Sequence, residues 1–334
     1  MDFNTVLSDF AADLAAARDA AVVCELPQLA SLGVAGVDAE SFLQGQLTSD
    51  VAALAPGTAQ HSAWCSPKGR VLANFLLRRI DAQTFALLLP APLLEPIRKR
   101  LAMFVLRSKV ALADASAATA HLGVGGPAAA KCVESVLGIA PRLLHFDAAG
   151  GAAVAALPGG RFIVAAAPDP ARALGGRLAE CARPAALVAW EWLAIRAGVP
   201  MILPATQDQF IPQMINWDAL GGVSFEKGCY AGQEIVARTQ YLGRLKERLV
   251  LAHVDAAAPS PGARGFSASF GDQPCATVVN AAPAPGGGSD LLAVCQTAAA
   301  ASDDLRLGAP DGLALRMLPL PYELPATTPR SRLA

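Results

Sequence analysis

Short apolar runs separated by turn residues recur through the first 240 residues and predict strands joined in hairpins. The runs 61–65 and 71–78 flank a Ser-Pro-Lys-Gly-Arg turn, and the runs 152–157 and 162–166 flank a Pro-Gly-Gly turn. Because a hairpin pairs its strands antiparallel, this pattern favours an α+β fold over a doubly wound parallel sheet. Further strands are expected over residues 22–26, 30–36, 85–89, 109–112 and 121–123.

Between these strands, apolar side chains recur at helical spacing. Phe3, Phe10 and Leu14 share one face of an amphipathic helix predicted at the start of the chain, and Asp38 is a favourable N-cap for another. Alternation of these helices with the hairpins indicates two mixed α/β lobes within residues 1–243. The predicted helices span residues 1–20, 39–47, 92–106, 128–137, 171–181, 186–197 and 232–242.

The pattern changes after Gly243, where short strands alternate with turns rich in proline and glycine. Such spacing is typical of a small β-barrel, which we expect over residues 244–320. Residues 321–334 are rich in proline, and we expect a flexible tail there. The strands of this part are predicted over residues 248–254, 265–270, 276–279, 291–296 and 313–317.

Composition narrows the classes of function. The chain has 334 residues, 53% of them hydrophobic, and a net charge of −1, which argues against a protein that coats nucleic acid. The N-terminus has no secretory signal pattern and no run is long and apolar enough for a membrane span, so we expect a cytoplasmic protein.

The seven cysteines are widely spaced and do not cluster with the four histidines. We therefore expect reduced thiols and no metal site.

Charged, polar, aromatic and thiol side chains crowd together only in residues 225–238. Cys229 precedes a predicted helix and lies two residues from Lys227. A helix N-terminus and a neighbouring ammonium both favour a thiolate, so Cys229 is a candidate functional thiol. The alternative is that Cys229 is a small buried hydrophobic residue, as most lone cysteines are.

Three other segments carry candidate ligand-binding groups. Gln44 and Gln46 offer amides at the end of a predicted helix, and Lys68 and Arg70 offer cations in the first hairpin turn. Amide and acid groups are also dense in residues 207–218. For each segment there is a plainer interpretation, in which the amides bond the local backbone and the cations are simply solvated.

The motif Lys-Gly-Cys-Tyr-x-Gly-Gln-Glu at residues 227–234 is similar to the signature of the YgfZ family. These are folate-binding proteins related to the glycine-cleavage T-protein (an aminomethyltransferase) and linked to the maintenance of iron–sulfur proteins. Three further elements resemble the family: Gln-Gly-Gln-x-Thr-x-Asp at 44–50, the Lys-Gly-Arg turn at 68–70, and Phe-x-Pro-Gln-x-x-Asn at 210–216. The resemblance covers roughly residues 25–325.

The resemblance implies a T-protein-like architecture, with the two α/β lobes surrounding a central cavity and the barrel as a third lobe. It also implies tetrahydrofolate or a derivative as ligand, with the Cys229 loop bordering the cavity and Cys229 and Lys227 as the reactive groups. The partners it implies are iron–sulfur client proteins, without a membrane or sequence-specific nucleic acid. The residues expected to contact folate are Gln44, Gln46, Lys68, Arg70, Asn74, Glu191, Arg196, Gln213, Tyr230, Gln233, Glu234 and Arg238.

Two departures from the transferase relatives separate the possible functions. Those enzymes carry an acidic pair where this chain has Ala73 and Asn74, and a glutamate where it has Arg196. Asparagine cannot act as a carboxylate base, which favours an accessory protein for iron–sulfur enzymes, including those that modify tRNA. The alternatives are a folate-dependent aminomethyltransferase or demethylase, and a scaffold without a ligand in which Cys229 only packs.

Overall fold

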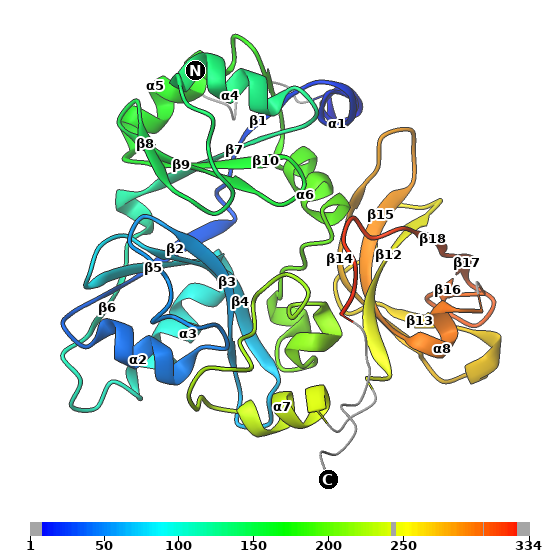
Figure 1. The fold of residues 1–334 in the computed structure, drawn as a ribbon. Helices are drawn as coiled ribbons and strands as arrows, with labels where there is room; N and C mark the ends of the chain where they lie inside the picture. Colours follow the sequence, from blue (N-terminus) through cyan, green and yellow to red (C-terminus); the bar gives the residue numbers. More distant parts are fainter. Residues whose placement is uncertain (1–8, 242–244, 303, 326–334) are drawn as a thin grey trace.

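Three β-sheets organise the fold of the computed structural model, which describes residues 9–241, 245–302 and 304–325. Figure 1 shows them as three lobes around a common centre, with the C-terminal barrel on the right. The architecture confirms the predicted α+β class, with two mixed lobes and a small barrel. In the described part of the chain, no helix is long and apolar enough to cross a bilayer.

The first lobe is a six-stranded sheet built from two separate parts of the chain, in the order β11-β1-β7-β10-β9-β8. Its strands pair antiparallel except for β1 with β11. The helices α4 and α5 pack on one face of the sheet, while α1 and α6 pack on the other. The elements are α1 (Phe10–Asp19), β1 (Val22–Glu25), β7 (Ala120–Gly125), α4 (Ala129–Leu137), β8 (Asp147–Ala149), β9 (Ala152–Leu157), β10 (Arg161–Ala166), α5 (Pro168–Leu178), β11 (Arg183–Pro184) and α6 (Leu187–Arg196).

The second lobe is a five-stranded antiparallel sheet in the order β3-β4-β5-β2-β6. Apolar side chains of α2 and α3 cover one face and form a separate core with Leu32, Phe75 and Leu87. This lobe is inserted between β1 and β7 of the first sheet, so the two lobes are interleaved in sequence. Its elements are β2 (Leu29–Ala35), α2 (Ala39–Gln46), β3 (Ala59–Cys65), β4 (Val71–Arg79), β5 (Thr84–Pro90), α3 (Ala91–Ala102), β6 (Ala111–Asp114) and the 3₁₀ helix η2 (Ser116–Ala118).

The third lobe is a seven-stranded sheet that curls into a nearly closed barrel, in the order β17-β16-β13-β14-β15-β12-β18. Its interior is a small core that includes Val254, Leu291 and Leu305. The elements are β12 (Glu247–Val254), β13 (Arg264–Phe266), η5 (Ala268–Phe270), β14 (Ala276–Pro283), β15 (Ser289–Gln296), α8 (Thr297–Ala300), β16 (Arg306–Leu307), β17 (Leu313–Ala314) and β18 (Arg316–Leu318).

A connecting segment between α6 and the barrel contacts all three lobes. It contains the short helices η3 (Pro204–Thr206) and η4 (Pro212–Ile215) and then α7 (Gln233–Tyr241). Its buried side chains, Trp217 among them, join residues of all three sheets in the largest apolar cluster. Burial of this shared surface is what holds the lobes together.

Several predicted boundaries differ from the structure. The helix expected over 92–106 ends at Ala102, and Leu106 adopts a φ of 47°, which a right-handed helix does not allow. Asp38 does not cap α2, because its carboxylate accepts a hydrogen bond from the backbone N–H of Lys109 at 2.7 Å. The strand expected over 265–270 ends at Phe266, and a 3₁₀ turn follows it.

At the two ends of the chain, the predicted helix and the predicted tail lie only partly within the described residues. The first eight residues of the predicted N-terminal helix and residues 326–334 of the predicted tail lie outside the described residues. Tyr322, inside the predicted tail, packs against the end of α6, where its hydroxyl donates to the carbonyl oxygen of Gly198 at 2.8 Å.

The prediction that all seven cysteines are reduced is wrong. Cys132 on α4 and Cys181, just after α5, form a disulfide across 49 residues of sequence, with their Cα atoms 5.5 Å apart. The two helices lie side by side on one face of the first sheet, which brings the cysteines together. Their wide sequence spacing gave no sign of this pairing. The free cysteines among the described residues are Cys24, Cys65, Cys229, Cys275 and Cys295.

Candidate functional site

The β3–β4 hairpin links two places where functional residues gather. Its turn, residues 66–70, meets the Cys229 motif, and its middle lines a cavity between the lobes. Asn74 in the middle is five residues from Gly69 at the tip, which is on the order of 15 Å along a strand. The two places therefore lie along one rigid element but do not coincide.

Two glycines allow the hairpin tip to contact the Cys229 motif. Gly69 and Gly232 have φ angles of 69° and 81°, which favour glycine. A methyl group at Gly232 would lie 2.4 Å from the carbonyl oxygen of Ser66, and one at Gly69 would lie 2.9 Å from Cβ of Ile235. The Lys-Gly-Arg turn and the start of α7 thus touch backbone to backbone, so two of the sequence motifs form one structural unit.

Lys227 fixes the same motif to the C-terminal end of α2. Its ammonium donates to the carbonyl oxygens of Gln44, Leu47 and Ser49 at 2.6, 2.7 and 2.9 Å. It also lies 5.2 Å from the centre of the Tyr230 ring. Burial lowers the pKa of Lys227 to about 8, so the side chain is still protonated at neutral pH. A lysine ammonium has three N–H donors, and here backbone carbonyls accept all of them.

Cys229 is exposed, whereas the other four free cysteines are buried. The ammonium of Lys227 donates to three backbone carbonyls at the end of α2, and the expectation that it also supports a thiolate at Cys229 stays a prediction. The helix α7 begins at Gln233, four residues beyond Cys229. The thiol is therefore accessible from the surface and is not held by the first turn of the helix.

The predicted glutamine ligands bond within the protein. The side chain of Gln44 donates to Asp50 at 2.9 Å and accepts from the backbone N–H of Val51 at 2.7 Å. Gln46 accepts from the indole N–H of Trp64 at 3.3 Å. Gln213 is buried and donates to the carbonyl oxygen of Val236 at 2.7 Å, which ties η4 to α7. For Gln44 and Gln46, the plainer interpretation of local bonding is the one the structure supports.

The predicted cations and the remaining residues of the motif surround this unit. Lys68 is exposed at the hairpin tip, and Arg70 donates to the carbonyl oxygen of Gln209. Glu234 and Arg238 are exposed on α7, and Gln233 is half-buried. Tyr230 is buried, and its hydroxyl has no partner among the described residues.

A cavity of about 280 Å³ lies where the three lobes meet, with walls from the first sheet, the second sheet, α6 and the barrel. Most of its lining is apolar or aromatic, including Trp190 and Trp217. Small-molecule sites typically combine such walls with a few polar groups. Of the residues predicted to contact folate, the structure places Asn74 and Glu191 in this lining.

The expectation that the Cys229 loop borders the cavity is wrong. No residue of the motif at 227–234 lines the cavity, because α7 packs on the hairpin tip rather than on its middle. Arg196 lies outside the lining as well, and its guanidinium faces the barrel at 3.6 Å from a carboxylate oxygen of Asp290. The predicted residues that do not line the cavity are Gln44, Gln46, Lys68, Arg70, Arg196, Gln213, Lys227, Cys229, Tyr230, Gln233, Glu234 and Arg238.

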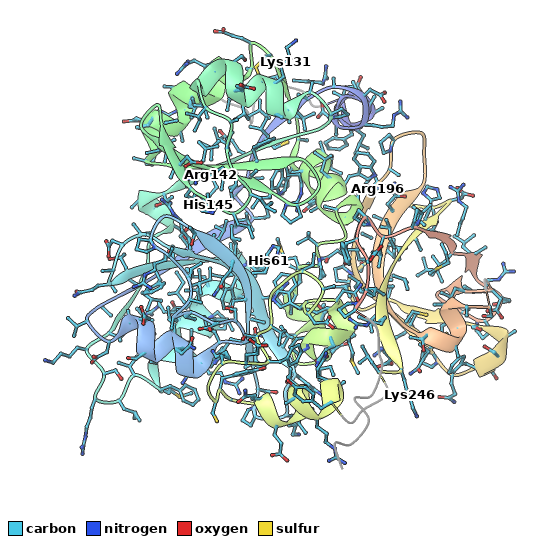
Figure 2. All side chains as sticks on the ribbon, in the orientation of Figure 1. His61, Lys131, Arg142, His145, Arg196 and Lys246 are labelled. Carbon is cyan, nitrogen blue, oxygen red and sulfur yellow. A yellow bond between two sulfur atoms is a disulfide. The ribbon has the colours of Figure 1, made fainter. Side chains whose placement is uncertain are left out.

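Three polar side chains of the lining have hydrogen-bonding capacity that the protein does not use. The side-chain oxygen of Gln28 and the indole N–H of Trp217 are buried and have no partner among the described residues. His61 lies near the centre of the molecule (Figure 2) and bonds the carbonyl oxygen of Leu220 through Nδ1 at 3.0 Å. Burial lowers the pKa of His61 to about 4, so the ring is neutral and its proton is on Nδ1.

Arg161 contributes a buried cation to the same cavity. The residue is 4% exposed, and its guanidinium lies 5.0 Å from the centre of the Trp190 ring. Gly123 on the adjacent strand makes room for that ring, since a methyl group there would lie 2.4 Å from it. Sequence reasoning missed Arg161, although a charged residue at the start of an otherwise apolar strand was an available signal.

Asn74 and Glu191 differ in what they offer a ligand. The Asn74 amide donates to the carbonyl oxygen of Pro200 and accepts from the N–H of Ile202, both at 2.8 Å. It therefore holds the connecting segment in place. Glu191 is exposed at the rim of the cavity, and desolvation by the surrounding protein raises the pKa of its carboxyl. It is the one carboxylate among the described residues that line the cavity.

Comparison with known proteins gives consistent matches over most of the chain. Residues 3–157 match the family model described as the GCVT N-terminal domain. The chain is 34% identical to the tRNA-modifying protein YgfZ of Edwardsiella ictaluri over 302 residues, which cover 87% of this chain and 89% of that protein. It is 32% identical to the protein of the same name from Pectobacterium atrosepticum over 320 residues, 91% of this chain and 92% of the relative.

The fold also matches a solved structure. The glycine cleavage system aminomethyltransferase T from Bartonella henselae superposes with a TM-score of 0.73, covering 94% of this chain and 89% of that one. At 17% sequence identity, this match shows a shared fold alone.

Proposed function

The chain belongs to the YgfZ family, and on this premise we propose that it is a tetrahydrofolate-binding accessory protein for the assembly or repair of iron–sulfur enzymes. Enzymes that modify tRNA are among the proposed clients, in keeping with the name of the relatives, tRNA-modifying protein YgfZ. In this proposal the central cavity binds the folate, and Cys229 is the functional thiol.

The observation that carries the folate proposal is the set of unpaired polar atoms in an aromatic-walled cavity. Leaving a buried donor or acceptor without a partner costs about 1–3 kcal/mol, and native proteins rarely leave several such atoms in one place. Gln28 and Trp217 contribute such atoms between the walls of Trp190 and His61, and Arg161 adds a cation to the same lining. A folate combines a flat heterocycle with hydrogen-bonding edges and carboxylates, which suits this mixture of groups.

The accessory role is favoured over one-carbon transfer by the lack of a positioned base. Asn74 stands at the position of a transferase acid, and both ends of its amide are occupied by the backbone. Glu191 lies at the rim, and no described residue of the cavity lining orients its carboxylate toward the place of a reacting atom. A transferase needs a carboxylate in hydrogen-bond reach of the proton it removes.

The separation of Cys229 from the cavity supports two distinct tasks. A client protein reaches an exposed thiol at the hairpin tip more easily than one inside a cavity. The folate, in turn, contacts the middle of the same hairpin. We propose that the thiol acts on the client while the folate occupies the cavity.

Folate binding is tested by calorimetry with tetrahydrofolate under anaerobic conditions. We expect saturable binding to the wild type and weaker binding, by about tenfold or more, to Glu191→Gln, because a charge-assisted hydrogen bond to the heterocycle is lost. Glu134→Gln, on the surface of α4, is the matched control and should bind as the wild type does. Absence of heat with wild-type protein at high concentration would refute the folate proposal.

The role of Cys229 is tested separately, in cells that lack the protein and are complemented with variants. We expect Cys229→Ser to lower the activity of an iron–sulfur tRNA-modifying enzyme, whereas Glu226→Gln, an exposed neighbour, should not. Full activity with Cys229→Ser would show that the Cys229 thiol is not the functional group. Catalytic transfer of a formaldehyde-level carbon from an amine donor to tetrahydrofolate would favour the transferase alternative instead.

A further inference from the structure

An exposed apolar patch lies where the loop between α3 and β6 meets the turn after β2. Leu106 in this loop is 87% exposed and Met103 is 65% exposed. Single exposed apolar residues are common, but a cluster of large ones typically marks an interaction site. We call this cluster and the cations around it the α3–β6 patch, which consists of Val37, Met103, Phe104, Leu106, Arg100, Arg107 and Lys109.

The turn after β2 touches the loop directly. The carboxylate of Asp38 accepts a hydrogen bond from the backbone N–H of Lys109 at 2.7 Å, and a methyl group at Gly36 would clash with the carbonyl oxygen of Lys109. Val37, between these two residues, therefore lies beside the loop. An open hollow of about 730 Å³ is lined by Asp38 and residues 104–108. The patch thus offers a partner both exposed apolar side chains and a recess.

The backbone of the loop holds Leu106 outward. Leu106 adopts a φ of 47°, in the left-handed region that leucine rarely occupies. Backbone hydrogen bonds on both sides fix the turn, from Phe104 to Leu101 at 2.9 Å and from Ser108 to Val105 at 2.8 Å. Residues kept in strained conformations by their surroundings gather at functional sites. This conformation does not bury Leu106, which points to a role in binding.

The cations of the patch are available to a partner. Arg100, Arg107 and Lys109 are exposed, and none of the described acidic side chains forms an ion pair with them. Arg98 and Lys99, by contrast, both pair with a glutamate on the same helix. Apolar side chains beside unpaired positive charges are complemented by an apolar surface rimmed with carboxylates. The partner that fits this chemistry is a protein with such a surface.

Other occupants fit the patch less well. Nucleic acid would meet the aliphatic side chains of Leu106 and Met103 where phosphate contacts need cations. Segments that bind anionic membranes typically carry about four to eight cations, whereas three are unpaired here. A second copy of this chain would bring like charges together.

The patch adjoins the helix that anchors the Cys229 loop. Phe104 packs edge-on against Trp64, with the ring centres 6.0 Å apart, and the indole of Trp64 donates to Gln46 at the end of α2. Lys227 bonds three carbonyl oxygens at this end of α2. In Figure 1, α2 lies between the α3–β6 loop and α7. A partner on the patch is therefore close to the element that holds the Cys229 loop.

We propose that the α3–β6 patch docks the iron–sulfur client protein, through an apolar surface of the client that is rimmed with carboxylates. This inference rests on the proposed function and names the surface on which the client binds. Leu106 packs on the apolar part of that surface, while Arg107 and Lys109 face its carboxylates. Docking at the patch leaves the exposed thiol of Cys229 free to act on the bound client.

Docking is tested by biolayer interferometry between the whole chain and a purified iron–sulfur enzyme that modifies tRNA. We expect Leu106→Asp to weaken binding by at least about tenfold, because it places a negative charge against an apolar and acidic surface. Arg107→Glu should weaken binding in the same way, and higher salt should weaken binding of the wild type.

Leu313→Asp on the barrel and Arg172→Glu on α5 are the matched controls, since they make the same changes at exposed positions of the other lobes. Both should bind the enzyme as the wild type does. Aspartate enters the left-handed region more readily than leucine, so Leu106→Asp should keep the fold, which circular dichroism and thermal unfolding establish. Should it prove unfolded, Arg107→Glu carries the comparison.

The other occupants are tested with the same proteins. Unfractionated tRNA and phosphatidylglycerol vesicles are assayed for binding, and sedimentation velocity detects a dimer. If Leu106→Asp abolishes one of these associations and leaves binding of the enzyme unchanged, the patch serves that occupant and the inference is wrong.

Complementation separates the inference from the proposed function. In cells that lack the protein, Leu106→Asp should lower the activity of the tRNA-modifying enzyme as Cys229→Ser does, while the purified variant binds tetrahydrofolate as the wild type does. If Cys229→Ser lowers the activity and Leu106→Asp does not, the inference is wrong and the proposed function stands. If loss of the whole protein leaves the activity unchanged, the proposed function fails. The inference then stands only if the wild type binds the enzyme and Leu106→Asp does not, and it is overturned otherwise.

Discussion

At the scale of single residues, Lys227 and Cys229 are close in sequence but lie in different environments. The side chain of Lys227 points into the protein and holds three carbonyls, whereas Cys229 is exposed. One of the polar groups in the motif therefore has a structural role, because Lys227 anchors the loop. This role is separate from any chemical role of the motif.

The exposure of the thiols predicts their reactivity. Cys229 alone should react with Ellman's reagent in the native protein, because burial raises the pKa of Cys24 and Cys295 to about 12 and keeps the reagent out. Denaturation should release five thiols in total and reduction seven, since Cys132 and Cys181 form the disulfide. Cys229→Ser should leave no thiol that reacts in the native state. A native count of two or more would contradict the burial of the others.

Removal of the Lys227 ammonium should weaken the fold around α2. Lys227→Met leaves three buried carbonyl oxygens without donors, and we expect a loss of about 3 kcal/mol in the free energy of unfolding. Urea unfolding followed by tryptophan fluorescence measures this loss. Lys131→Met, at an exposed position on α4 (Figure 2), is the control and should change stability by less than about 0.5 kcal/mol. If the two variants changed the free energy of unfolding equally, the Lys227 hydrogen bonds would not stabilise the fold.

At the scale of elements, one buried ion pair joins the barrel to the connecting segment. Arg248 on β12 donates to both carboxylate oxygens of Asp218 at 2.7 and 2.9 Å, and also to the carbonyl oxygen of Gln213 at 2.9 Å. The side chains of Arg248 and Asp218 are 9% and 2% exposed. The barrel is thus attached near the end of η4 by a contact that water does not reach.

Breaking this pair on one side should be worse than removing both partners. Asp218→Asn leaves the Arg248 charge buried without its partner, and we expect a loss of about 3–5 kcal/mol in unfolding free energy. The double variant Asp218→Leu/Arg248→Met should lose clearly less. The exposed pair of Arg172 and Asp169 is the comparison, and its removal should cost no more than about 1 kcal/mol. If the double variant were the least stable of the set, the desolvation argument would be wrong.

At the scale of the whole molecule, the lobes meet around His61. This residue belongs to the second sheet, bonds the connecting segment at Leu220 and packs against Trp217, with the ring centres 4.9 Å apart and the ring planes tilted by 41°. It faces the cavity together with Arg161 of the first sheet. A charge on this ring would therefore be buried between lobes.

His61 should make the fold sensitive to acid. Its pKa is about 4 in the folded protein and 6.5 ordinarily, so between these values the unfolded chain binds a proton that the native protein does not. Stability contributed by neutral His61 is present above pH 6.5 and is lost as the pH falls toward 4. Between pH 7 and pH 4.5 the loss should be about 2.5 kcal/mol.

The measurement is urea unfolding at both pH values for the wild type and for His61→Gln, which keeps an N–H donor for Leu220. The variant should show the smaller decrease. His121, whose pKa burial also lowers to about 4, acts in the same direction, so His61→Gln/His121→Gln should flatten the dependence further. An unchanged slope in both variants would show that neither ring is buried in solution.

The sequence by itself determined the local structure and the family. Alternation of apolar residues specified the hairpins and most helices, because side-chain period follows directly from backbone geometry. The motif around Cys229 identified the family, and the loss of acid at Asn74 was visible in sequence, since both are properties of residue type at a fixed spacing.

Only the tertiary structure decided which of these residues lie close together in space. Packing of α4 beside α5 made the Cys132–Cys181 disulfide, and docking of α7 on the hairpin tip put Cys229 outside the cavity. Arg161 and His61, isolated in sequence, came together where three lobes meet. The physical reason is that burial and the partners of a polar group depend on contacts between distant segments, which the order of residues along the chain does not reveal.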